Sequence, residues 1–114
     1  MSLSLDTNIS ALNALATHQQ VTANNIANSD SKEFKKSAAV LEEGSTGTVS
    51  TKTQRVNTPG VMINQPDGSL EELSNVDLGQ ELVNMIPTQH AYQANLKALQ
   101  ANQEMEDNVL NLIG

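Results

Sequence analysis

The sequence contains no cysteine and no tryptophan, and Phe34 and Tyr92 are its only aromatic residues. The absence of cysteine excludes a disulfide framework, a thiolate metal site and a cysteine nucleophile. With so few aromatic rings, the 114-residue chain lacks the large side chains that fill a thick globular core. No apolar run approaches the ~20 residues of a transmembrane helix, so membrane insertion is not expected.

Basic residues are also scarce. The chain has 6 Lys and Arg against 13 Asp and Glu, and residues 70–114 contain Lys97 as their single base. Nucleic acids and anionic membrane surfaces are bound through a surplus of Lys and Arg, so neither is an expected partner. Residues 1–16 contain no Lys or Arg, which argues against a cleavable signal peptide. Any export would therefore use a route that does not read one.

Motifs of catalysis and metal binding are missing as well. The sequence has no Walker loop, no dinucleotide-binding glycine pattern, no nucleophile elbow and no His-Glu-x-x-His motif. His18 and His90 are the only histidines, and neither has an acidic residue four positions away that would help to hold a metal. We therefore expect no enzyme activity, no cofactor and no metal site.

The first recognisable pattern is helical. Residues 3–28 contain neither Gly nor Pro. Steps of three and four place one set of residues on a single helix face: Leu5, Ile9, Leu12, Ala16, Gln19, Ala23 and Ile26. Asp6 or Thr7 is the expected N-cap, and the polar run at 28–31 is the expected end.

A second helical pattern covers residues 76–112. Its stripe consists of Leu82, Met85, Gln89, Tyr92, Leu96, Leu99, Gln103, Glu106, Leu110 and Ile113. Asp77 is the expected N-cap. Pro87 lies inside the pattern, and because proline lacks a backbone donor we expect a kink or a local break there.

The middle of the chain favours short strands. Residues 32–43 fit either a short helix or an extended segment, whereas 46–56 alternate in the manner of a strand. Turn signals at 58–60 and 65–68 separate two further short runs, 61–63 and 69–73. A small β-hairpin or meander is therefore expected between the helices.

Together these patterns predict a mainly α fold. Two long terminal helices form an antiparallel coiled-coil pair, with the small β element between them. The expected parts of this one structural unit are 1–31, 32–75 and 76–114. Two helices leave much of each stripe uncovered, so the sequence points to a protein that assembles with other copies or other chains.

Both ends of the chain resemble one family. Asn24, Asn25, Ile26, Ala27 and Asn28, followed by a polar turn and then Phe34 and Lys35, resemble the N-terminal signature of flagellar rod, hook and hook-associated proteins. Residues 76–78, 81–86 and 89–95 are similar to the C-terminal helix of the proximal rod proteins. Glu33 departs from this pattern, because the family usually has Gly there, and Pro87 interrupts a helix that the family usually keeps continuous.

The resemblance implies a structural component of the flagellar basal-body rod. Such a protein polymerises with itself and with other axial proteins into the shaft that crosses the periplasm and transmits torque. It is exported by the flagellar type III apparatus without a cleaved signal. The alternative is a soluble helical adaptor, or a rod-protein paralogue that binds the rod or the export machinery without joining the shaft.

The stripes and the family motif together yield the candidate assembly residues. These are Leu12, Ala16, Asn24, Asn25, Ile26, Asn28, Phe34, Lys35, Leu82, Met85, Gln89, Tyr92, Asn95, Leu96 and Leu99. The asparagine run is expected to end the first helix, where Asn tolerates left-handed geometry, and also to bond to neighbouring subunits. Gln19, Gln89 and Gln103 fit either exposed positions or buried amides that set register. Tyr92 is expected to pack between the helices with its hydroxyl at the edge.

Overall fold

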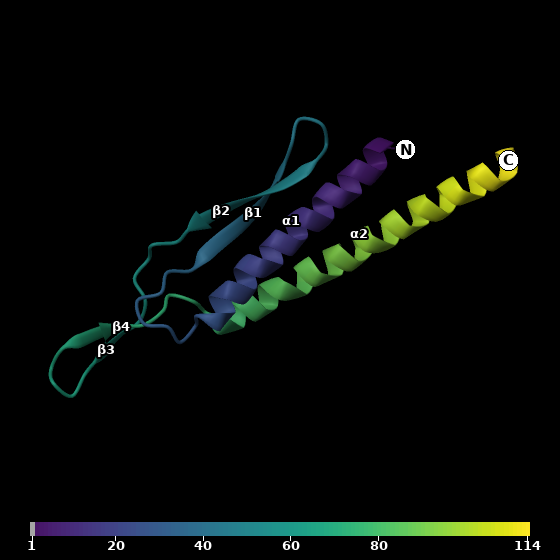
Figure 1. Ribbon diagram of the computed structural model, residues 1–114. Helices are drawn as coiled ribbons and strands as arrows, with labels where there is room; N and C mark the ends of the chain where they lie inside the picture. Colours follow the sequence, from purple (N-terminus) through teal and green to yellow (C-terminus); the bar gives the residue numbers. More distant parts are fainter. Residues whose placement is uncertain (1) are drawn as a thin grey trace.

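The computed structural model describes residues 2–114, with side chains from residue 5 onward; Met1, the first residue of the expected N-terminal part, lies outside them. The elements are α1 (Ser2–Ala27), β1 (Ser37–Glu43), β2 (Val49–Arg55), β3 (Met62–Asn64), β4 (Leu70–Glu72) and α2 (Leu78–Ile113). The two helices lie side by side and run in opposite directions (Figure 1). Strands β1 and β2 lie along α1, whereas β3 and β4 lie beyond the end of the pair at which α1 stops and α2 begins. The predicted fold class is confirmed.

Helix α1 begins earlier than the capping signals suggested. It starts at Ser2, so the prediction of Asp6 or Thr7 as N-cap is wrong, and both lie inside the helix. Its end agrees with the prediction, because the Asn28 amide bonds to the Asn24 carbonyl at 3.1 Å and the Asn28 side chain donates to the same carbonyl at 2.9 Å. The first turn of α1 therefore forms without a cap from Asp6 or Thr7, and Asn28 bonds to the carbonyl of Asn24 at the last turn.

Helix α2 begins as predicted and continues where a break was expected. The Asp77 side chain accepts a hydrogen bond from the Gln80 amide at 3.2 Å and caps the helix. The prediction of a local break at Pro87 is wrong, since one helix runs from Leu78 to Ile113 through it. Pro87 removes the donor to the Val83 carbonyl, but both residues are exposed, so water can replace that donor.

The strands form two separate hairpins and no meander. Strands β1 and β2 pair antiparallel from Ser37↔Arg55 to Glu43↔Val49, and β3 pairs with β4 from Met62↔Glu72 to Asn64↔Leu70. The open question over residues 32–43 is resolved as a strand from Ser37 onward. The β1–β2 hairpin lies along α1, where the Thr51 hydroxyl donates to the Ala14 carbonyl at 2.8 Å.

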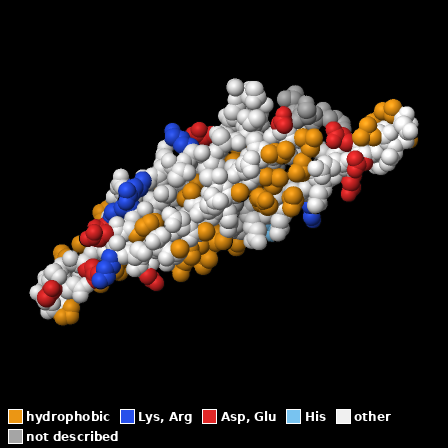
Figure 2. Space-filling view, viewed as in Figure 1, with side chains coloured by type: hydrophobic (Ala, Val, Ile, Leu, Met, Phe, Trp, Pro, Cys, Tyr) orange, Lys and Arg blue, Asp and Glu red, His pale blue; other side chains and the backbone are white. Residues whose placement is uncertain are grey.

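The molecule is long and thin. Its extents are 79 × 24 × 15 Å, and its radius of gyration is 20.2 Å, against about 13 Å for a compact domain of this length. Among the described residues, the buried hydrophobic side chains are Ala11, Ala14 and Leu15. Large hydrophobic residues remain on the surface, including the free end of α2 (Figure 2). The core is therefore too thin to cover the apolar side chains of the chain.

The turn after α1 contains a left-handed residue that is not glycine. Glu33 has φ of 60°, a backbone conformation that costs an L-residue about 1–2 kcal/mol. Its amide donates to the Glu72 carbonyl at 3.1 Å, so the turn is anchored to β4 in this conformation. The positive φ of the turn is therefore present even though Glu occupies the position.

We expect Glu33→Gly to stabilise the protein by about 1 kcal/mol, because glycine adopts this φ without steric cost. The Tm should rise by about 4 °C, measured by circular dichroism at 222 nm. Asp30→Gly is the matched control, since Asp30 is exposed in the same turn and has no positive φ. A Tm that falls equally in both variants would contradict the prediction.

Candidate assembly surface

Hydrogen-bonded side chains form part of the contact between the two helices. The Thr88 hydroxyl lies 3.2 Å from His18 Nδ1, and the Asn25 amide donates to Glu81 Oε1 at 3.4 Å. Thr88, Asn25 and Glu81 are all buried. The helices therefore meet through small and hydrogen-bonded side chains, and the apolar stripes are not confined to this contact.

Much of the predicted α2 stripe faces outward. Leu82 is 49% exposed, and Tyr92 and Leu96 are each 39% exposed. Gln89 is exposed, whereas Met85, Asn95 and Leu99 are half-buried. On α1, the predicted Leu12, Ala16 and Ile26 are also half-buried. We call the side of the helix pair that carries Leu82, Tyr92 and Leu96 the flank, and its apolar surface is only partly covered.

A groove along this flank brings part of the set together. Its volume is about 600 Å³, and its hydrophobic lining consists of Leu15, Ala16, Met85, Tyr92 and Leu96. The rest of the lining is Thr88 and four amides, Gln19, Gln20, Gln89 and Gln93. Tyr92 was expected between the helices, and it forms part of this open groove.

The asparagine motif binds within the chain. Asn25 is 1% exposed, and its side chain donates to the Ser37 carbonyl at 2.7 Å and accepts from the Ser37 amide at 3.0 Å. The Asn25 side chain thus pairs with the Ser37 backbone in the way that a neighbouring strand would, and it links the start of β1 to α1. Asn28 bonds to the side chain of Asn24 at 3.1 Å, and Ser31 donates to Asn28 at 3.0 Å. The amides of Asn25 and Asn28 thus serve the end of the helix and the start of the hairpin.

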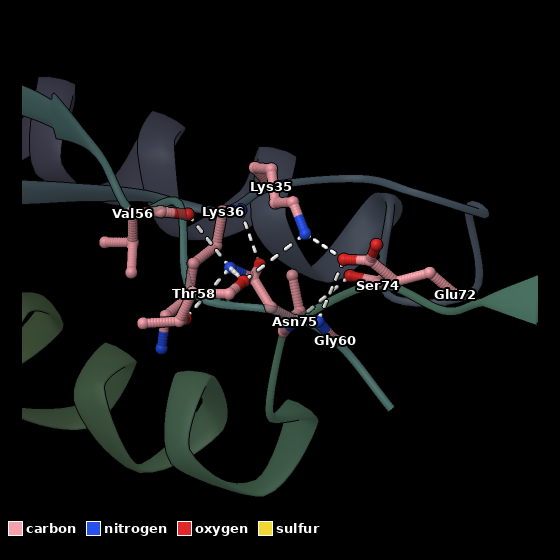
Figure 3. A network of polar contacts seen from close by, with 9 residues as sticks. Lys35, Lys36, Val56, Thr58, Gly60, Glu72, Ser74 and Asn75 are labelled. Atoms are coloured by element: carbon pink, nitrogen blue, oxygen red, sulfur yellow. Dashed lines mark hydrogen bonds and ion pairs between the residues drawn. The ribbon is translucent and has the colours of Figure 1, made fainter. Parts of the chain in front are cut away.

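Lys35 belongs to a polar network at the base of the helices (Figure 3). Its ammonium forms an ion pair with Glu72 and donates to the Thr58 carbonyl at 3.3 Å. The same Glu72 oxygen accepts the Gly60 amide at 3.0 Å. The hydrogen bond from Lys35, followed by that from Gly60, holds the pKa of Glu72 below its ordinary value. Glu72 therefore joins the turn after α1 to the segment before β3.

Asn75 is the centre of the network, and sequence reasoning missed it. Its side chain accepts from the Lys36 amide at 2.7 Å and donates to the carbonyls of Val56 and Thr58 at 2.9 and 3.0 Å. Its own amide donates to the Phe34 carbonyl at 3.2 Å. Three segments distant in sequence thus meet at one residue. No motif spacing in the sequence identifies Asn75. The available sequence signal is its position as a polar residue directly before the Val76-Asp77-Leu78 match.

The described part of the chain shows no metal centre and no membrane-spanning helix. Within residues 2–114, no group of three or more His, Cys, Asp or Glu side chains is placed to hold a metal ion. None of the helices described there combines the length and the hydrophobicity needed to cross a bilayer.

Comparison with known families identifies the class of protein. Residues 5–35 match the model described as flagella basal body rod protein, and residues 67–112 match the C-terminal model of the flagellar basal body rod FlgEFG proteins. Together the matches span more than half of the chain and contain most of both helices. They also contain Asn25 and Asn75. The chain belongs to the flagellar basal-body rod protein family.

A curated relative is a hook protein. Over 45 residues the chain is 49% identical to the flagellar hook protein FlgE of Brucella suis biovar 1 (strain 1330). The aligned stretch covers 40% of this chain and 11% of that protein. The chain thus spans a small part of the length of the relative that it matches.

Proposed function

We propose that this chain is a structural subunit of the flagellar basal-body rod. It polymerises through its terminal helices, residues 1–31 and 76–114, with itself and other axial proteins into the shaft that transmits torque. Residues 32–75 lie outside this helical layer. The subunit reaches the periplasmic rod through the flagellar type III export apparatus.

The observation that carries this proposal is the exposure of apolar side chains on helices that match the family. Ile9, Leu82 and Ile86 are 47, 49 and 56% exposed. Burying such surface is favourable, and contiguous exposed apolar patches are characteristic of association sites. A helix pair with so little core of its own gains most from neighbours along its length.

The proposed mechanism is mechanical. Helices that interdigitate between subunits resist twisting because relative rotation would separate packed side chains. The base network, through Glu72 and Asn75, keeps the helices and hairpins in fixed relative positions within each subunit. Torque would then pass through many noncovalent contacts without any chemical step.

We expect Leu82→Asp and Leu96→Asp to reduce rod assembly at least ten-fold, because each places a carboxylate on the apolar flank. Variants would be expressed in a strain with an in-frame deletion of this gene, and isolated basal bodies would be counted by electron microscopy. Leu41→Asp is the matched control, because Leu41 on β1 is 43% exposed, close to the 39% of Leu96. Export would be verified in the same cells.

Two results would contradict the proposal. Complete basal bodies and swimming cells in the deletion strain would favour an adaptor or paralogue that does not join the shaft. Normal rods with both Leu82→Asp and Leu96→Asp would show that the flank is not the assembly surface. Truncated rods in the deletion strain, restored by the wild-type gene, would support it.

A further inference from the structure

Helix α2 is longer than its partner. The pairs His18–Thr88 and Asn25–Glu81 define the antiparallel register, and Ser2 therefore comes level with about residue 104 of α2. Residues 105–113, hereafter the overhang, have no α1 residue opposite them in the described chain. At 1.5 Å per residue the overhang is about 13 Å long.

The overhang is the most exposed apolar segment of the helices. Met105, Val109, Leu112 and Ile113 are 57, 49, 87 and 79% exposed, and Leu110 is 65% exposed. The first four are spaced i, i+4, i+7 and i+8, the pattern by which an amphipathic helix binds in a groove. Where α1 covers α2, the contact is made by polar residues such as Glu81 and Thr88. Exposed apolar side chains of α2 thus continue beyond the part of the helix that α1 accompanies.

The groove on the flank matches the overhang in length and in character. It runs along α2 from Met85 to Leu96, about 16 Å, and its hydrophobic lining is open to solvent. None of its lining residues is charged. The overhang carries acidic residues, Glu106 and Asp107, and a groove whose lining contains no acidic residue receives this helix without like-charge repulsion.

One polar atom of the groove lacks a partner. Among the described residues, Gln19 Oε1 is a buried side-chain oxygen without a hydrogen bond. Buried polar atoms are normally satisfied, and one that is not calls for an explanation. The overhang has two exposed amide side chains, Asn108 and Asn111. Rotation of the Gln19 amide toward such a donor would break no hydrogen bond of its oxygen.

We propose that the overhang of one copy docks in the groove of a second copy. The overhang and the groove are different surfaces of the same chain, so the contact is heterologous and repeats without closing. The inference rests on the proposed rod function and names the contact between its subunits. Four anchor side chains bury less than a standard protein interface, so each contact is weak alone and effective where many copies are aligned.

The cysteine-free sequence permits a direct test by disulfide cross-linking. Purified Leu112→Cys is mixed with Gln93→Cys, oxidised at high protein concentration, and analysed by non-reducing electrophoresis and mass spectrometry. We expect the mixed dimer to form at least ten-fold faster than with Ala94→Cys, the matched control. Ala94 is also exposed and is adjacent in sequence to Gln93, but it does not line the groove. Equal rates for the two pairs would overturn the proposal.

A chain carrying both Gln93→Cys and Leu112→Cys tests the geometry. The two cysteines lie about 28 Å apart on one helix, so they cannot join within a chain. A ladder of trimers and longer species is expected, whereas dimers alone would indicate a closed, reciprocal pair and overturn the open-ended contact.

Complementation with Leu112→Asp separates the groove contact from the proposed rod function. Normal rods in that strain overturn the groove contact alone, and normal rods in the deletion strain overturn the rod function alone.

Discussion

Asn25→Asp is expected to lower the free energy of unfolding by about 4 kcal/mol at pH 7. The substitution removes the donor to the Ser37 carbonyl and sets a carboxylate beside that carbonyl and beside Glu81. At 1% exposure the new charge has almost no contact with water, and an uncompensated buried charge typically costs 3–5 kcal/mol. The start of β1 should then separate from α1.

Urea unfolding followed by circular dichroism measures this loss. Asn24→Asp is the matched control, because Asn24 is exposed and its side-chain oxygen already accepts a hydrogen bond, which a carboxylate preserves. We expect the control to change stability by less than about 0.5 kcal/mol. Similar losses in the two variants would refute the role of Asn25 as the link between helix and hairpin.

Gly60→Ala is expected to destabilise the protein by about 3 kcal/mol. A Cβ atom at Gly60 would lie 1.9 Å from the Leu73 carbonyl oxygen, which is backbone and cannot turn aside. Relief of the clash requires the strand segments around Val61 and Leu73 to move apart, which also strains the Gly60–Glu72 hydrogen bond. Overpacking of this kind commonly costs 1–3 kcal/mol.

Gly79→Ala provides a control of opposite sign. Gly79 lies in the first turn of α2, and a Cβ there meets nothing closer than 3.5 Å. Alanine favours the helix by about 1 kcal/mol over glycine, so this variant should unfold at a higher temperature. Hydrogen exchange of the Leu73 amide should accelerate in Gly60→Ala alone. A Gly60→Ala protein as stable as wild type would contradict the close approach.

Local chemistry made much of the fold predictable. Residues 3–28 contain no Gly or Pro and have helical periodicity, and Asp77 is a typical N-cap. Both signals identify the helices from the sequence because they act within a few residues. The turn at 65–68 is equally local, since Asp67 accepts the Ser69 amide at 2.9 Å inside it. The local break considered at Pro87 does not occur, because exposure to water decides whether a helix tolerates the missing donor.

The candidate surface could be predicted only in part. Helical period places Leu82 and Leu96 on one side of α2, but it does not say which side α1 covers. The helices meet instead through His18, Thr88 and Glu81, because hydrogen bonds between their side chains satisfy the polar groups that the contact buries.

By itself the sequence determined two long helices, short strands between them, and a surplus of apolar side chains over any core they could build. The tertiary structure alone decided that Asn25 joins β1 to α1 and bonds to Glu81 of α2, and that Asn75 connects three segments. The reason is physical: helix and turn propensities act over a few residues, whereas these contacts join groups 12 to 56 positions apart.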